Sequence, residues 1–277
     1  MGIPGAGKSS VANDYADRGY LRLNRDERGG SLRELSESLH HALSSGTERV
    51  VLDNTYLTRA TRSHVIESAH RHRLPARCIW LDTPLAQAQV NLVERLLDRF
   101  GSLPSPEDLA QQAKREPGLL APASQMRSYR ELEPPSDGEG FVDVERVAFT
   151  RAPSRRAHAG VFVAAAALRR PDWHDAMKDI DTTAPYLVFD WSADGRIPDD
   201  LNACVTRLAA RVSGSVESAI CTHGGGPPRC WCRPPLPGLP LAFARAHDID
   251  TAKSTLIGAG PAHATLARAL GATYRST

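Results

Sequence analysis

The chain has 277 residues, of which 41% are apolar and 24% are charged, and its formal net charge at pH 7 is +2. This length has room for two domains of ordinary size, and the apolar fraction is sufficient for a packed core in each. A net charge this close to zero excludes a coating protein with a uniformly basic surface, so any contact with nucleic acid must come from a local basic patch.

A glycine-rich motif, G-x-x-x-x-G-K-[ST], opens the chain and runs from Gly2 to Ser9. In such a loop the glycines bring backbone N–H groups close to the phosphates of a nucleotide, a lysine reaches the β- and γ-phosphates, and a hydroxyl ligates Mg²⁺. We therefore predict that ATP binds here with Mg²⁺ on Ser9; a Gly-rich turn without a ligand is the alternative. The residues predicted to contact the nucleotide are Gly2, Gly5, Gly7, Lys8, Ser9 and Ser10.

A loop of this kind ordinarily follows a buried strand of about five apolar residues, and here only Met1 precedes it. The sequence thus predicts a sheet without its first strand. Either the start lies further upstream or the chain is shortened.

Short apolar runs alternate with amphipathic segments through the first 150 residues. Strands are predicted at 20–24, 49–53, 77–81 and 141–149, and helices at 31–45, 60–73, 85–100, from 105 onward and around 129. Strands that alternate with helices predict an α/β fold, with a parallel sheet covered by helices on both faces.

Two aspartates follow the ends of predicted strands in this half. Asp26 comes directly after the strand 20–24, and Asp53 ends the strand 49–53. Because the carboxyl ends of parallel strands face the ligand, both carboxylates are expected beside the phosphates, with Asp53 as part of the cofactor site. The alternatives are a helix cap or a solvated charge for Asp26, and a carboxylate that holds the neighbouring loop for Asp53.

Phosphoryl transfer requires in-line geometry, charge neutralisation and a group that accepts the hydroxyl proton. We assign these catalytic roles to Lys8, Arg95 and Asp26. A surface ion pair with Glu94 or Asp98 is the alternative for Arg95.

Four motifs in this half occur in an order that resembles the kinase domain of the polynucleotide 5′-kinase/3′-phosphatases. They are Gly2 to Ser9, Asn24-Arg25-Asp26, Leu52-Asp53-Asn54-Thr55 with Arg62 beyond it, and Tyr129-Arg130 followed by Glu133-Pro134-Pro135 and Glu139-Gly140-Phe141. The resemblance covers about residues 1 to 150. It implies that Asp26 is the general base, that Arg95, or Arg99 as second choice, stabilises the transferred phosphoryl group, and that Arg62 binds substrate. One departure is Gly29, where the phage form has an arginine.

The composition changes after residue 150, where arginines and prolines indicate a linker, and 185–190 reads as a buried strand that ends in a carboxylate. Five cysteines occur in the chain, and three of them lie within twelve residues. Cys221, His223, Cys230 and Cys232 form an N/S set that suits a structural Zn²⁺ ion. Reduced cysteines without a metal are the alternative.

Residues 185 to 277 resemble the zinc-bearing phosphatases of the haloacid dehalogenase superfamily, of the histidinol and heptose bisphosphate type. The zinc cluster with Arg233-Pro234-Pro235 and the segment 254–272 carry this resemblance. The family's first motif has a second aspartate two residues after the nucleophile, whereas here Asp190 is followed at that spacing by Ser192. Its lysine falls on Pro234, and its Mg²⁺-binding aspartates fall on Ala259 and His263. The resemblance therefore implies a catalytically inactive scaffold held by zinc.

These observations predict a P-loop kinase domain at 1–150, a linker and the start of a second domain at 151–184, and a haloacid-dehalogenase-like domain at 185–277. The predicted function is ATP-dependent phosphoryl transfer to a 5′-hydroxyl end of RNA or DNA. A kinase of a small metabolite and a nucleotide-binding adaptor without turnover are the alternatives. No apolar run spans a bilayer and no secretory signal precedes the loop, which predicts a cytoplasmic protein without a membrane partner. The oligomeric state stays open.

Overall fold

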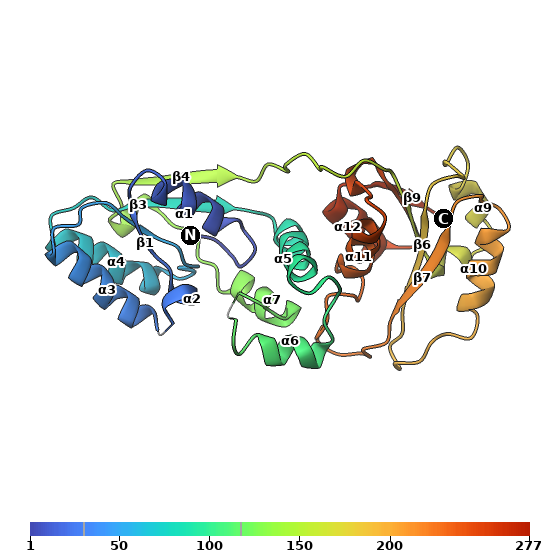
Figure 1. Ribbon diagram of the computed structural model, residues 1–277, viewed down its shortest axis with the longest axis horizontal. Coiled ribbons are helices and arrows are strands. Elements are labelled where there is room, and N and C mark those ends of the chain that lie inside the picture. The colour runs from blue at the N-terminus through green and yellow to red at the C-terminus, as the bar shows by residue number, and fades with distance from the viewer. Residues whose placement is uncertain (30, 117) are drawn as a thin grey trace. The chain divides into compact units, whose positions relative to one another are not determined.

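The computed structural model describes residues 1–29, 31–116 and 118–277, and the chain divides into two compact units. The first unit comprises Met1–Asn91, Gln112–Leu120 and Ser124–Thr150, and the second comprises Leu92–Gln111, Ala121–Ala123 and Arg151–Thr277. Both contain parallel strands connected through helices, so the predicted α/β class is confirmed (Figure 1). Among the described residues, no helix has the length and apolar character that a membrane crossing requires.

The first unit contains four strands and the helices that connect them. They are α1 (Lys8–Ala16), β1 (Leu21–Leu23), α2 (Arg25–Arg28), α3 (Leu32–Ser44), β2 (Val50–Leu52), α4 (Arg59–Arg71), β3 (Arg77–Asp82), the 3-10 helix η1 (Asp137–Glu139) and β4 (Asp143–Ala148). Three further helices have residues in both units: α5 (Leu85–Phe100), α6 (Pro106–Gln112) and α7 (Pro122–Arg130).

The strands of the first unit form two separate parallel pairs, β1 with β2 and β3 with β4. Met1 lies beside β3, where its nitrogen donates to the carbonyl oxygen of Ile79 at 2.5 Å and its own carbonyl accepts from the nitrogen of Leu81 at 2.9 Å. The chain then turns directly into the glycine-rich loop. Among the described residues no strand lies between β2 and β3.

Helix α3 illustrates how local sequence and packing agree in this unit. Ser31 accepts a hydrogen bond from the nitrogen of Glu34, whose carboxylate in turn accepts from the nitrogen of Ser31, so the helix begins with a capping box. Leu35, Leu39 and Leu43 recur at helical spacing and are buried against the β1–β2 pair. Figure 1 shows α3 and α4 side by side.

The second unit is built on one sheet. Its elements are β5 (Val161–Ala164), α8 (Ala165–Leu168), α9 (Trp173–Ala176), β6 (Tyr186–Trp191), α10 (Leu201–Ala209), β7 (Val216–Cys221), α11 (Gly238–Ala246), the 3-10 helix η2 (Thr251–Lys253), β8 (Thr255–Gly258), α12 (Pro261–Leu270) and β9 (Thr273–Ser276). The five strands are parallel, in the order β7-β6-β5-β8-β9.

The centre of this sheet is β5, which lies in the segment expected to contain a linker and the start of the second domain. Every residue of β5 is buried, and Phe162 and Val163 have no exposed surface. Strands buried on both faces are typical of parallel sheets covered by helices. The segment 151–184 therefore supplies the strand around which the second unit is assembled.

Candidate functional site

The glycine-rich loop lies at the carboxyl edge of the first unit and leads into α1. Gly2, Gly5 and Gly7 have φ values of 152°, 84° and 94°, a region that side chains disfavour. A Cβ atom on Gly2 would lie 2.9 Å from the carbonyl oxygen of Leu81, so the close approach of loop and strand requires glycine there. Gly7 and Ser9 are exposed at the start of α1, where helix N–H groups lack intrahelical partners and attract anions.

Side chains from distant parts of the chain hold this loop. Three of them donate hydrogen bonds to its carbonyl oxygens: Thr83 to Ala6 at 3.0 Å, Asn91 to Gly5 at 2.8 Å and Gln125 to Pro4 at 3.0 Å. The Nζ atom of Lys8 also donates to the carbonyl oxygen of Ile3 at 2.9 Å. The three anchoring residues were not predicted, because each lies far from the loop in the sequence.

The two predicted carboxylates are linked through Asn24. The side-chain oxygen of Asn24 accepts from the nitrogen of Asp26 at 2.7 Å and caps α2, while its Nδ2 donates to Oδ2 of Asp53 at 2.8 Å. The same Oδ2 accepts from Arg22 at 2.6 Å, and Asp53 is buried. This arrangement favours the alternative in which Asp53 holds the neighbouring loop. Asp26 keeps a side chain that is 42% exposed, as a proton acceptor requires.

The side chain of Arg62 is buried within the first unit. Its side chain is 2% exposed and forms an ion pair with Glu139 at 2.7 Å, and it also donates to the carbonyl oxygens of Tyr56, Leu57 and Glu133. A guanidinium that is saturated and buried in this way connects α4 to the loop before β4. The predicted substrate-binding role of Arg62 stays a prediction, and the contacts of this side chain are those of a structural residue.

Arg95 lies on the part of α5 that belongs to the second unit, and its side chain is exposed. Its alternative partners have other contacts, because Glu94 binds Arg156 at 3.0 Å and Asp98 binds Arg245. The predicted role of Arg95 in charge neutralisation stays a prediction.

The four predicted zinc ligands converge at the end of β7. The sulfur and Nδ1 atoms of Cys221, His223, Cys230 and Cys232 all lie within 4.8 Å of one another. Tetrahedral zinc with bonds of about 2.0 to 2.3 Å places neighbouring ligand atoms about 3.3 to 3.8 Å apart. The distance is 3.5 Å between Cys221 and Cys230, 3.6 Å between Cys221 and His223, and 3.1 Å between His223 and Cys232. The residues therefore fit a structural zinc ion.

At the carboxyl edge of the second sheet, β6 carries Asp190, whereas alanines follow β5 and β8. Asp190 lies on β6, next to the centre, and accepts from Arg169 at 2.7 Å. Arg169 also binds Asp200, and the hydrogen bonds that it donates to Asp200 and Asp190 raise the pKa of its guanidinium. The central strand β5 is followed by Ala165, and its neighbour β8 is followed by Ala259. Ligands of doubly wound sheets bind at this position, where the strand order reverses.

Comparison with known proteins confirms both predicted resemblances. Residues 1–117 match the family model described as an AAA domain. The chain is 30% identical over 124 residues to a D-glycero-beta-D-manno-heptose-1,7-bisphosphate 7-phosphatase from Bordetella bronchiseptica, a match that covers 44% of this chain and 66% of the relative. It is 28% identical over 152 residues to a bifunctional polynucleotide phosphatase/kinase from Schizosaccharomyces pombe, which covers 54% of this chain and 32% of the relative. At the family level these findings support an enzyme of phosphoryl transfer.

Proposed function

We propose that this chain, which joins a P-loop kinase-like domain to a haloacid-dehalogenase-like domain, transfers the γ-phosphoryl group of ATP to a 5′-hydroxyl end of RNA or DNA. The observation that carries the proposal is the common edge of the first unit. The nitrogen of Gly2 donates to the carbonyl oxygen of Thr55, just after β2, while Asp26 follows β1 and is tied to Asp53 through Asn24. The phosphate loop thus contacts the end of β2, and the proposed proton acceptor follows the end of the neighbouring strand β1.

In the proposed reaction the residues of the loop bind and orient the nucleotide. Backbone N–H groups from Gly5 to Ser10 and the ammonium group of Lys8 receive the phosphates, and Ser9 holds Mg²⁺, which supplies charge neutralisation when bound. Arg95 is proposed to add a further positive charge at the transferred group.

Asp26 accepts the proton of the acceptor hydroxyl in this scheme. As that oxygen forms its bond to the γ-phosphorus, the bond from the γ-phosphorus to the bridging oxygen breaks and ADP leaves. Asp53 and Arg22 act as positioning residues, since they touch Asn24 and the strand end rather than the reacting atoms.

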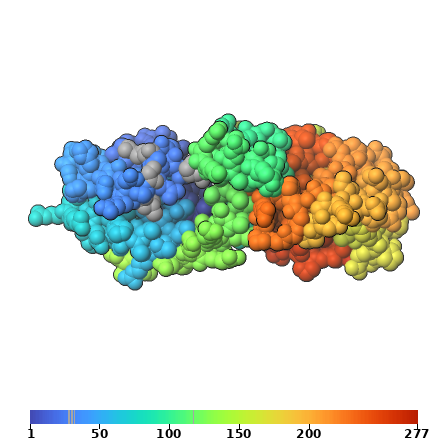
Figure 2. All heavy atoms as spheres, turned by 90° about the horizontal axis from the view of Figure 1, so that it is seen from below, coloured from blue at the N-terminus to red at the C-terminus, as the bar shows by residue number. Residues whose placement is uncertain are grey.

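Two observations favour a polynucleotide over a small metabolite as the acceptor. One relative carries the name polynucleotide phosphatase/kinase. In addition, α4 and the turn after it contain the exposed arginines Arg71 and Arg73. Figure 2 shows the blue-to-cyan part of the chain, to which α4 belongs, at the surface of the first unit. Such basic side chains attract a phosphate backbone without reading its sequence.

The second unit is proposed to serve as a zinc-held scaffold without phosphatase activity. Asp190 is paired with Arg169, and alanines follow the two strands at the switch point, so these positions offer no carboxylate for Mg²⁺. Zinc on Cys221, His223, Cys230 and Cys232 would hold the loop from β7 to α11.

The decisive experiment incubates the chain with [γ-³²P]ATP and a 5′-hydroxyl oligonucleotide, RNA or DNA. Label is expected on this oligonucleotide and not on a matched 5′-phosphorylated one, and Lys8→Ala is expected to abolish the transfer. ATP turnover with small alcohols alone would indicate the metabolite kinase, and ATP binding without any transfer would indicate the adaptor.

A further inference from the structure

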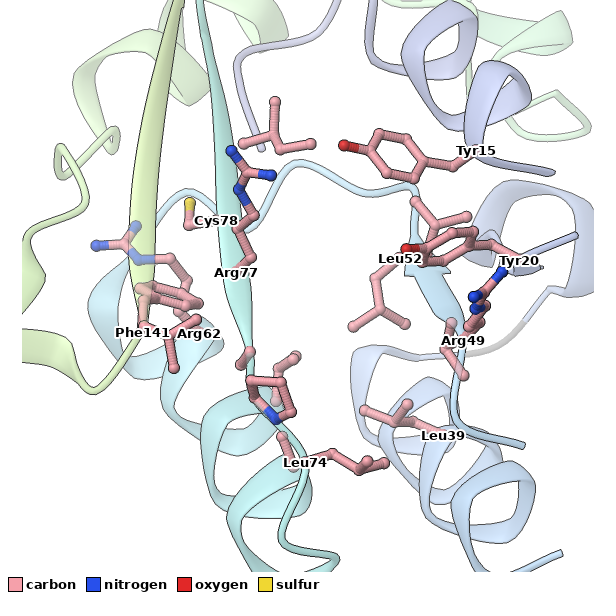
Figure 3. Close-up of a pocket in the computed structure, with 18 of the residues that line it drawn as sticks. Tyr15, Tyr20, Leu39, Arg49, Leu52, Arg62, Leu74, Arg77, Cys78 and Phe141 are labelled. Carbon is pink, nitrogen blue, oxygen red and sulfur yellow. The ribbon is translucent and has the colours of Figure 1, made fainter. Parts of the chain in front are cut away.

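Two cavities of similar volume in the described part of the chain have different linings. One, of about 470 Å³, lies in the first unit beside β2 and β3, and most of its lining residues are apolar. Figure 3 shows Leu39, Leu52 and Leu74 among the side chains around it. The other, of about 450 Å³, lies in the second unit, and no carboxylate occurs among the described residues that line it. We call it the arginine cavity and define it by Arg169, Arg170, Trp173, His174, Arg207 and Arg211.

The lining of the arginine cavity comes from three consecutive helices of the second unit. Arg169 and Arg170 follow α8, and Trp173 and His174 begin α9. Arg207 lies on α10 and is exposed. Residues of one compact unit thus form the whole cavity.

Arg207 and Arg211 bring two positive charges that no carboxylate balances among the described residues. The Nη2 atom of Arg207 donates to the carbonyl oxygen of Leu168 at 2.9 Å, which fixes its guanidinium at the end of α8. The backbone nitrogen of Arg211 donates to the carbonyl oxygen of Leu208 at 2.9 Å, so the chain turns once more after α10. Arg211 therefore lies about one helical turn beyond Arg207.

The other two arginines of the cavity have acidic partners outside its lining. Arg169 binds Asp190 and Asp200, each at 2.7 Å. Arg170 lies 3.6 Å from Asp172, and both side chains are about half exposed. Exposed ion pairs of this kind contribute little to stability, so Arg170 can turn to a bound anion at low cost.

An aromatic surface accompanies these charges. The rings of Trp173 and His174 pack against each other, with their centroids 4.1 Å apart and an angle of 35° between their planes. Trp173 is buried, whereas His174 is exposed. An exposed ring that a buried neighbour supports offers a surface on which a nucleobase can stack.

We propose that the arginine cavity binds a single strand of nucleic acid, with backbone phosphates on Arg207 and Arg211 and a base against His174. A positively charged groove beside an aromatic ring is the combination with which proteins hold single strands without reading their sequence. A guanidinium is suited to this role because it binds phosphate through two parallel N–H donors. The inference rests on the proposed function, since it concerns the same class of substrate, and it gives the second unit a binding role.

The phosphate contacts are tested by the salt dependence of binding. A labelled single-stranded oligonucleotide with a 5′-phosphate is titrated with the full chain, without ATP, and fluorescence anisotropy gives Kd at a series of salt concentrations. Each phosphate contact adds about 0.7 to the slope of log Kd against log salt concentration, so Arg207→Gln combined with Arg211→Gln is expected to lower this slope by about 1.4. The matched control replaces Arg196 and Arg268, exposed arginines of the same unit outside the cavity, and is expected to keep the slope.

The aromatic contact is tested by a different change in the same assay. His174→Ala is expected to weaken binding about tenfold without a change of slope, because a stacked base loses its platform but no phosphate loses its partner. His174→Phe, which keeps a ring, is expected to bind as tightly as the original chain. Hydrogen exchange in residues 169–174 and 204–211 is expected to slow when the oligonucleotide is bound.

An unchanged slope in the variant of Arg207 and Arg211, or an equal loss of slope in the control, would overturn the inference. Equal slowing of exchange in residues 169–174 and 204–211 by inorganic triphosphate would indicate a site for small polyanions and would also overturn it. A strand with a 5′-phosphate cannot accept a phosphoryl group, and the assay contains no ATP. Failure of this inference and failure of the proposed kinase activity are therefore separate results.

Discussion

Asp26 depends on its neighbours for its position but not for its exposure. Asn24 fixes the backbone of Asp26, and Asp53 fixes Asn24 from the buried side. The carboxylate of Asp26 is itself 3.2 Å from Arg25 and remains accessible to an incoming hydroxyl. We propose that a group with this placement acts in the transfer step without contributing to the nucleotide site.

Replacing Asp26 with Asn is expected to lower kcat by about 10² to 10⁴ and to leave the Kd for Mg-ATP unchanged, because the amide cannot accept the hydroxyl proton. Single-turnover transfer and equilibrium nucleotide binding measure the two effects. Asp14→Asn, at an exposed position of α1, serves as the control. Transfer at the original rate in Asp26→Asn would remove Asp26 from the mechanism.

The ion pair between Arg62 and Glu139 is expected to stabilise the first unit. Both side chains are almost fully buried, at 2% and 3% exposed, so Glu139→Ala leaves an unpaired buried guanidinium and is expected to cost about 3 to 5 kcal/mol. Denaturant unfolding monitored in the first unit measures this loss. The exposed pair of Arg33 and Glu37 is the control, since Glu37→Ala is expected to cost less than about 1 kcal/mol.

The same pair gives the first unit an acid sensitivity. Hydrogen bonds from Arg62 hold the pKa of Glu139 below its ordinary value of 4.5. The stability that depends on this carboxylate is therefore fully present above pH 4.5 and is lost as the pH falls through the lowered, folded-state pKa. The Glu139→Ala variant is expected to lose this part of the pH dependence; an unchanged acid transition would contradict the assignment.

The roles of single residues were predictable where the residues belong to one contiguous motif. They were not predictable where they depend on contacts between residues far apart in the sequence. Lys8 and Ser9 belong to a single motif of eight residues. Thr83, Asn91 and Gln125 bind the same loop across 77, 86 and 121 positions of sequence. The burial of Arg62 was not predictable for the same reason, because its partner Glu139 lies 77 positions away.

Among the elements, the predicted bounds agree best for one amphipathic helix and one apolar strand. The helix at 85–100 has the predicted bounds, and the strand at 77–81 differs by one residue. The central strand of the second unit was not identified as such, because Val161–Ala164 runs into an alanine-rich helix and its sequence has no boundary signal. Its position in the sheet depends on pairing with β6 and β8, which no local pattern encodes.

The loop between β7 and α11 contains no helix or strand, and its stability is expected to depend on zinc. The purified chain is expected to contain about one equivalent of zinc, and a chelator is expected to increase hydrogen exchange in residues 221–236, because metal binding to a structural site contributes folding free energy. Cys230→Ser should remove the metal, whereas Cys204→Ser, buried on α10 outside the cluster, should retain it. Retention of the full zinc content by Cys230→Ser would contradict the site.

For the whole molecule, the two units are expected to differ in chemistry although both have parallel sheets. The first unit has Asp26 and Asp53 at its strand ends, whereas alanines follow the two strands at the switch point of the second sheet. We expect no Mg²⁺-dependent phosphate release from 3′-phosphorylated oligonucleotides or sugar phosphates, and no change in Asp190→Asn, because Asp190 is paired with Arg169. Phosphate release that is lost in Asp190→Asn would establish a second active site.

The anchored carbonyls of the phosphate loop have a consequence for nucleotide affinity. In a trans peptide the C=O and the following N–H point in opposite directions, so fixing the carbonyls of Pro4 and Ala6 also orients the N–H groups of Gly5 and Gly7. The orientational entropy of these amides is then lost during folding rather than on nucleotide binding. A loop that adopted this arrangement one-tenth of the time would bind about tenfold more weakly. Thr83 and Gln125 are therefore expected to raise the affinity for the nucleotide by preorganising the loop. They contact its carbonyl oxygens, which point away from the N–H groups that they orient.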